Sequence, residues 1–102
     1  MSETSDIVGP TMKALAKIPG VYALRLQSGR RGRVQMCPAG TPDILVITRG
    51  KAAFLEAKLP GEKFSEPQVS AMFWIERAGS EVYEVNSVSD SLKIVKQLLK
   101  AG

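Results

Sequence analysis

The sequence of 102 residues contains no histidine and a single cysteine, Cys37. Zinc sites built from cysteine and histidine, Ser-His-Asp and Cys-His nucleophile pairs, and histidine acid–base catalysis are therefore excluded. One cysteine forms no internal disulfide, which is typical of a protein of the reducing cytoplasm. Any chemistry in this chain must rest on carboxylates, lysines or a bound hard metal ion.

The sequence also lacks a run of 18 apolar residues, and its N-terminus has no apolar signal-peptide core. We therefore expect neither membrane insertion nor secretion. Apolar residues make up 44% and charged residues 24%, a composition that favours a folded core over a disordered chain. At this length we expect one domain over residues 1–102 with a modest core, so self-association would add stability.

Positive charge is in excess, because 14 Lys and Arg residues stand against 10 Asp and Glu residues. One acid, Asp43, lies among the six basic residues of the stretch from 25 to 51, which are Arg25, Arg30, Arg31, Arg33, Arg49 and Lys51. Such a concentration suits a surface that neutralises phosphates, and it equally suits a solvated basic face. Glycines among the three central arginines predict a tight turn with these side chains at its tip.

Apolar periodicity predicts a mixed α/β domain with the order helix, three or four strands, helix, strand, helix. We expect a helix over 5–18, in which Gly9-Pro10 kinks the helix or delays its start, and a last helix over 88–100. Strands are predicted at 21–27, 33–37, 43–48, 52–58 and 81–85. A short turn joins 43–48 and 52–58 as a hairpin, and a right-handed crossover would make the strand at 81–85 parallel to its neighbour.

The middle helix has a marked start, in which Ser65 is the N-cap and Gln68 completes a capping box. Gly79 is a fitting end for this helix. Phe73 and Trp74 lie at helical spacing, and we expect them in the core or at a dimer contact rather than stacked on bases.

Three charged residues stand at the open end of the predicted hairpin. Asp43 begins one strand, and Glu56 and Lys58 lie near the end of the other. Because positions 43 and 56 straddle the turn almost symmetrically, Asp43 and Glu56 should be cross-strand neighbours. Glu56 and Lys58 are two apart in one strand and therefore share a face.

Two carboxylates this close repel unless a cation lies between them. Mg²⁺ or Mn²⁺ suits such hard oxygens, and the backbone carbonyl of Ala57 is a further candidate ligand. A cation there would activate a water molecule and offset negative charge on a phosphate, with Lys58 orienting the water or steadying that charge. The alternative is that all three residues are solvated charges at strand ends, although Ala53, Phe54 and Leu55 make this an apolar strand in which unpaired charges are costly.

The residues "AGTPDILVI", "AAFLEAKLPGEKFSEPQ" and their order resemble the VRR-Nuc domain of the PD-(D/E)xK nuclease superfamily, in its small stand-alone viral or bacterial form. The resemblance runs from about residue 3 to residue 90. It implies a restriction-endonuclease-like fold, a mixed β-sheet flanked by helices. It also implies Mg²⁺- or Mn²⁺-dependent cleavage of DNA phosphodiesters in the cytoplasm of a bacterium or a virus-infected cell. Stand-alone members are similar to Holliday-junction resolvases that act as homodimers on branched DNA.

By position in this family, Asp43, Glu56 and the Ala57 carbonyl would bind the metal, and Lys58 would be the catalytic lysine. Gln68 matches a glutamine that could touch the water shell of the metal or the scissile phosphate, or it could serve the capping box alone. The family also has a glutamate on the first helix, for which Glu3 is our candidate and Asp6 the alternative. Arg30, Arg31 and Arg33 fall in a variable basic loop, and their charge predicts contact with DNA phosphates.

Three functions remain compatible with the sequence. The first is a structure-selective DNA endonuclease that resolves junctions. The second is the same metal-dependent chemistry on less particular DNA, such as nicked, flapped or duplex substrates. The third is a non-catalytic basic module that binds nucleic acid, in which the acidic residues are incidental.

Overall fold

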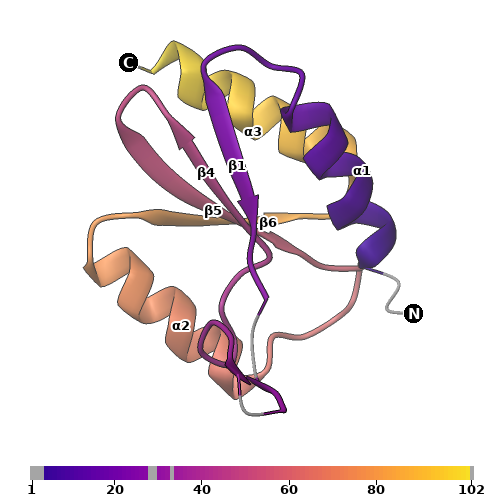
Figure 1. Cartoon of the computed structure of the whole chain (residues 1–102), viewed down its shortest axis with the longest axis vertical. Helices are drawn as coiled ribbons and strands as arrows, with labels where there is room; N and C mark the ends of the chain where they lie inside the picture. Colours follow the sequence, from indigo (N-terminus) through magenta and orange to yellow (C-terminus); the bar gives the residue numbers. More distant parts are fainter. Residues whose placement is uncertain (1–3, 28–29, 33, 102) are drawn as a thin grey trace.

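Figure 1 shows a mixed sheet with helices on both faces, in a computed structural model that describes residues 4–27, 30–32 and 34–101. The elements, in chain order, are α1 (Ser5–Leu15), β1 (Val21–Arg25), β2 (Arg30–Arg31), β3 (Val34–Gln35), β4 (Ile44–Thr48), β5 (Lys51–Ala57), α2 (Glu66–Arg77), β6 (Glu81–Val85) and α3 (Val88–Lys100). The main sheet has the order β1-β4-β5-β6, and β2 and β3 form a separate hairpin. β5 and β6 are parallel and the other pairs of the main sheet are antiparallel, which confirms the predicted mixed α/β architecture.

The β4–β5 hairpin has the predicted register. Ile44 pairs with Leu55, and Thr48 pairs with Lys51. Both turn residues have a positive φ, 53° at Arg49 and 78° at Gly50, as a type I′ hairpin turn requires. One step beyond the last pair, this register places Asp43 opposite Glu56.

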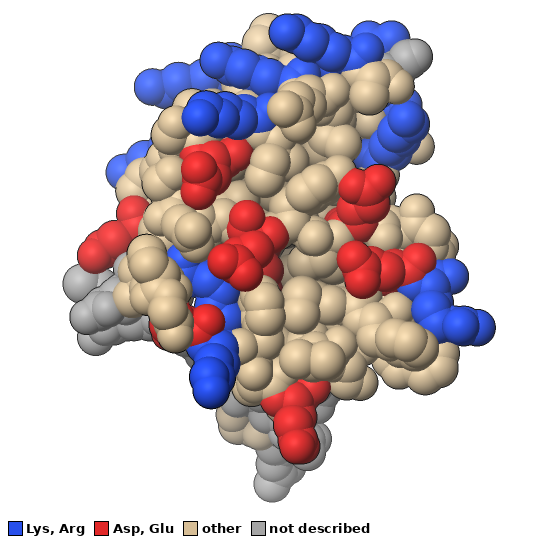
Figure 2. Space-filling model, turned by 180° about the vertical axis from the view of Figure 1, so that it is seen from behind, with Lys and Arg blue, Asp and Glu red and all other residues tan. Residues whose placement is uncertain are grey.

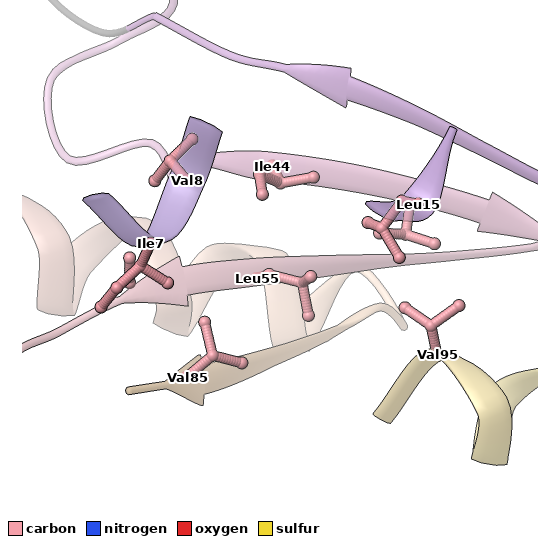
Figure 3. Close-up of a cluster of buried hydrophobic side chains, with 9 residues drawn as sticks. Ile7, Val8, Leu15, Ile44, Leu55, Val85 and Val95 are labelled. Atoms are coloured by element: carbon pink, nitrogen blue, oxygen red, sulfur yellow. The ribbon is translucent and has the colours of Figure 1, made fainter. Parts of the chain in front are cut away.

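The core lies between the sheet and the pair α1 and α3. Figure 3 shows Ile44, Leu55 and Val85 from three adjacent strands pointing toward side chains of the two helices, which are Ile7, Val8, Leu15 and Val95. Alternate residues of β5 face the other way, toward α2, because strand side chains alternate between faces. Leu55 and Ala57 therefore belong to the core face, whereas Phe54, Glu56 and Lys58 belong to the α2 face.

The first helix differs from its predicted form. It begins at Ser5 and contains Pro10, so of the two expected effects of Gly9-Pro10 a delayed start does not occur. It ends at Leu15 rather than at residue 18, because Lys17 and Ile18 donate backbone hydrogen bonds three residues back and so tighten the last turn.

Within the described residues, no helix is long and apolar enough to cross a membrane.

The second helix confirms its predicted start but not its predicted burial. Ser65 and Gln68 form a reciprocal capping box, and Gly79 follows the helix with a φ of 98°. However, no residue of α2 is buried, and Phe73 and Trp74 are 52% and 64% exposed. Of the two expected locations for these aromatic residues, the core of the monomer was wrong, and a dimer contact stays a prediction.

The basic residues between positions 25 and 51 are close in the sequence but lie in different parts of the fold. Arg49 and Lys51 lie at the β4–β5 turn, at the upper left of Figure 1, whereas the β2–β3 hairpin lies at the bottom. Arg25 ends β1 beside Ile44, the first residue of β4. The predicted concentration of charge is therefore not a single surface.

Gly40 fixes the start of α2 against the loop that precedes β4. Its φ is 86°, and a Cβ at this position would lie 2.1 Å from the backbone oxygen of Pro67. We expect Gly40→Ala to lower the free energy of unfolding by about 3 kcal/mol or more, because backbone strain and a collision with backbone add. Denaturant unfolding of the purified variant measures this loss.

Gly61 provides the matched control for that prediction. Its φ is 85°, but a Cβ there would meet nothing within 4 Å. Gly61→Ala should therefore show the strain alone, about 1 kcal/mol. Equal losses in the two variants would show that the contact with Pro67 is unimportant.

Candidate active site

Asp43 is held by the backbone of two neighbouring strands. Its carbonyl oxygen accepts a hydrogen bond from the Leu26 amide at 2.8 Å, and its Oδ2 accepts one from the Ala57 amide, also at 2.8 Å. Burial raises the pKa of Asp43, and the Ala57 amide and the charges of Arg25 and Lys58 oppose this rise. The carboxylate is thus fixed in place at the open end of the β4–β5 hairpin.

Glu56 is a buried carboxylate, only 3% exposed. Its Oε1 accepts a hydrogen bond from Gln68 Nε2 at 2.9 Å, whereas its Oε2 is buried and has no partner among the described residues. Burial and, second, the negative charge of Asp43 raise the pKa of Glu56 to about 7, against the opposing charge of Lys58. An unpartnered buried oxygen on an acid is costly, and this one lies beside another acid.

Lys58 is buried on the same face of the strand as Glu56, with 7% of its surface exposed. Its Nζ donates a hydrogen bond to the Lys63 carbonyl oxygen at 2.7 Å and lies 4.8 Å from the centre of the Phe64 ring. An ammonium group has three donors, so this arrangement orients the lysine and leaves donors for a further partner.

Gln68 joins the two interpretations that the sequence left open. Its Oε1 accepts from the Ser65 amide at 2.8 Å, which completes the capping box, and its Nε2 donates to Glu56. One side chain therefore fixes the start of α2 and one oxygen of the buried carboxylate.

The backbone of Ala57 faces Asp43. The Lys58 amide donates to the Val85 carbonyl at 3.0 Å on the β6 side, whereas the Ala57 amide donates to Asp43 on the β4 side. The amide and carbonyl of one strand residue point toward the same neighbour. The Ala57 carbonyl thus points to the side of Asp43, as a metal ligand at this position must.

Of the other predicted residues, none whose side chain the structure describes is brought to this group. Glu3 and Arg33 lie outside the described residues, and β2 places the backbones of Arg30 and Arg31. Asp6 is exposed on α1. In the part of the chain that the structure describes, no three Asp, Glu, Cys or His side chains form a cluster that could hold a metal, so Asp6 does not join Asp43 and Glu56.

Three contributors were missed in the sequence. The Lys63 carbonyl and the Phe64 ring hold Lys58, and the charge of Arg25 acts on Asp43. Lys63 and Phe64 follow a turn in which Glu62 Oε1 accepts from the Leu59 amide at 2.7 Å, and this turn leads the chain back past Lys58. No local pattern indicates that return, but Pro60-Gly61 marks the turn that makes it.

The group fits a hydrated Mg²⁺ or Mn²⁺. It offers hard oxygen donors from Asp43, Glu56 and the Ala57 carbonyl, and the unpartnered Glu56 Oε2 needs a positive partner. Mg²⁺ is commonly held by one or two carboxylates and keeps several waters, so two carboxylates are sufficient. Without such an ion, the two acids raise each other's energy at a buried position.

A comparison with solved structures finds a chain titled "VRR_NUC domain" that is similar over most of its length. The match covers 91% of this chain and 90% of that chain, with 24% sequence identity and a TM-score of 0.58. No protein-family model matches the sequence, and no curated protein matches it. The mixed sheet, its flanking helices and this match agree with the resemblance seen in the sequence. The chain therefore has the restriction-endonuclease-like fold of the VRR_NUC domain.

Proposed function

We propose that this chain is a Mg²⁺- or Mn²⁺-dependent deoxyribonuclease. The observation that carries the proposal is the buried, unpartnered oxygen of Glu56 next to Asp43, with the ammonium of Lys58 on the same face. Carboxylates that destabilise each other at a fixed position are typical of sites made for a cation. The fold shared with a structure titled "VRR_NUC domain" supports the nuclease interpretation.

Each residue has a distinct role in this proposal. Asp43, Glu56 and the Ala57 carbonyl would hold the cation. When bound, the cation supplies an activated water molecule and offsets negative charge at the scissile phosphate. Lys58, oriented by the Lys63 carbonyl, would donate its free N–H groups to a phosphate oxygen or to the attacking water. Gln68 keeps one oxygen of Glu56 occupied, so that the other would be left to bind the cation.

The proposed substrate is branched DNA, cut in the manner of a Holliday-junction resolvase. Rates on a four-way junction, a flap, a nicked duplex and a linear duplex test this, each with Mg²⁺, Mn²⁺ or EDTA. We expect cleavage only with metal and fastest on the junction. Similar rates on all four would indicate a less selective nuclease. Cleavage of none would contradict the proposal and favour a non-catalytic module that binds nucleic acid.

A homodimer is part of the proposal, because branched DNA presents two strands for cutting. Large apolar side chains remain exposed on the α2 side of the sheet and on α2 itself. They are Tyr22, Leu24, Ile47, Val69, Phe73 and Trp74. Exposed apolar side chains gathered on one side of a small protein are typical of a contact with another chain. Sedimentation equilibrium, with Trp74→Ala as the variant expected to dissociate, tests the dimer.

Gln68→Ala and Ser65→Ala form a matched pair that separates capping from support of the site. Both remove the capping box, but only Gln68→Ala also removes the hydrogen bond to Glu56. We expect Ser65→Ala to lose about 1 kcal/mol of stability, and Gln68→Ala to lose more because it also leaves Glu56 Oε1 without its partner. A 10- to 100-fold loss of cleavage rate is expected only in Gln68→Ala. Equal rates in the two variants would reduce Gln68 to a helix cap.

A further inference from the structure

Eleven of the 14 basic residues lie in parts of the sequence that contain no acid, and seven of them belong to three segments that the fold brings together. No Asp or Glu occurs between Asp6 and Asp43, between Asp43 and Glu56, or after Asp90. The basic residues in question come from α1 and the turn after it, from the β4–β5 turn, and from α3. They are Lys13, Lys17, Arg49, Lys51, Lys93, Lys96 and Lys100, called here the basic cap.

The fold brings these three segments to one end of the molecule. Lys51 Nζ donates to the Ala101 carbonyl oxygen at 3.3 Å, which ties the start of β5 to the end of α3. Gly20, which follows α1, lies against the Leu99 side chain of α3. All seven side chains of the basic cap are exposed. Figure 2 shows Lys and Arg side chains gathered across the top of the molecule, where Figure 1 places the end of α3, with carboxylates below them.

The charge of the chain is therefore strongly divided. The basic cap holds half of the 14 Lys and Arg residues, and the other seven are outnumbered by the 10 Asp and Glu residues of the sequence. Glu81 lies at the border of the cap, where it lines a surface pocket with Lys51, and it accepts a hydrogen bond from the Tyr83 hydroxyl. A net charge of +4 conceals a cap of +7 on a remainder of −3.

We infer that the basic cap binds the phosphate backbone of duplex DNA, at a place separate from the proposed active site. Lys93, Lys96 and Lys100 follow one side of α3 over about 10 Å, because a helix rises 1.5 Å per residue. A duplex carries one negative charge per about 1.7 Å of its axis, so such a row faces several phosphates at once. Lysine is a point charge that neutralises phosphate without reading sequence.

A membrane surface fits the basic cap less well than DNA does. Helices that bind a lipid surface insert apolar side chains beside their lysines. Among the described residues, none of the exposed large apolar side chains lies on α1 or α3. The two helices of the cap therefore offer charge without an apolar face to insert, and the exposed Tyr22 and Ile47 lie on the sheet instead.

The basic cap is distant from Asp43 and Glu56. These acids lie at the open end of the β4–β5 hairpin, and Arg49 lies beyond Thr48 at the closed end. Thr48 is five steps along the strand from Asp43, which is about 17 Å at the usual rise of a strand. If the proposed function holds, the cap would grip duplex away from the scissile phosphate, as an enzyme that acts on branched DNA requires.

The test is the salt dependence of binding to a fluorescent 20-base-pair duplex in EDTA, followed by anisotropy between 50 and 200 mM KCl. Each phosphate contact contributes about 0.9 to the slope of log K against log salt. We expect Lys96→Gln to lower the slope by about 0.9 and to weaken binding about eightfold at 0.1 M salt. Lys93→Gln/Lys96→Gln/Lys100→Gln should lower the slope by about 2.7.

Arg77→Gln is the matched control, because Arg77 is also an exposed cation near the end of a helix but lies outside the basic cap. It should bind almost as the parent chain does. An equal effect of Arg77→Gln and Lys96→Gln would overturn the inference, since binding would then depend on net charge alone. An unchanged slope in the triple variant, with its fold verified by thermal unfolding, would overturn it as well.

Two further measurements keep the outcomes distinct. Anionic vesicles of phosphatidylserine and phosphatidylcholine serve as a second probe, and tighter cap-dependent binding to vesicles than to duplex would overturn the assignment to DNA. Cleavage is assayed separately with metal. Loss of duplex binding in the triple variant of a chain that cuts no DNA would support the cap and sink the proposed function. Metal-dependent cleavage by the parent chain, with an unchanged salt slope in the triple variant, would support the proposed function and overturn the role of the cap.

Discussion

Glu56→Gln is expected to lower the metal-dependent cleavage rate by about three orders of magnitude and to leave the protein folded. Loss of a charged metal ligand removes roughly 4 kcal/mol of transition-state stabilisation, and each 1.36 kcal/mol is tenfold in rate. Glutamine has the shape of glutamate and its Oε1 still accepts from Gln68, so the local packing remains. Single-turnover cleavage of the preferred DNA substrate measures the rate.

Glu76→Gln is the matched control for this substitution. It makes the same chemical change at an exposed position of α2 and should leave the rate unchanged. Asp43→Asn should behave as Glu56→Gln does, because both remove one carboxylate from the same pair. A rate within tenfold of the parent chain in both site variants would remove Asp43 and Glu56 from the chemistry.

The second large effect is a pH-dependent loss of stability that originates at Glu56. The pKa of this group rises from 4.5 in the unfolded chain to about 7 in the folded protein, because burial and Asp43 disfavour its charge. The folded state thus holds the proton more tightly than the unfolded state between these values. The free energy of unfolding should therefore fall as the pH rises from about 4.5 to 7, by about 3 kcal/mol in the absence of metal.

Denaturant unfolding in EDTA at several pH values between 4 and 8 measures that decline. Glu56→Gln cannot ionise, so the difference in stability between this variant and the parent chain should change by about 3 kcal/mol across the range. Saturating Mn²⁺ should restore the stability of the parent chain at pH 8, since a ligand that binds only the folded state stabilises it. Parallel pH curves for the two proteins would show that Glu56 ionises as freely as an exposed glutamate.

Much of the site follows from local pattern. The turn at Arg49-Gly50 fixes the hairpin, and the hairpin places Asp43 opposite Glu56, so the positions of these residues in the sequence predict the pair. Ser65 and Gln68 have capping chemistry that depends on a separation of three residues alone. These features depend on contacts whose geometry is set by a few adjacent residues.

Other features depend on how distant segments meet, and local pattern does not contain them. Periodicity gave α2 an apolar side, but it could not show that the small sheet leaves Phe73 and Trp74 exposed. The partners of Lys58 come from a loop whose path is set by a turn. Likewise, the basic cap draws its lysines from both ends of the chain, so no single stretch of sequence indicates it.

Calorimetric titration with Mn²⁺ at pH 7.5, without DNA, tests the proposed metal site most directly. The parent chain should show one saturable binding event, and Asp43→Asn and Glu56→Gln should each abolish it, whereas Glu76→Gln should retain it. The same saturable heat in all four proteins would contradict the metal site, because the ion would then bind without the two carboxylates that the β4–β5 hairpin brings together.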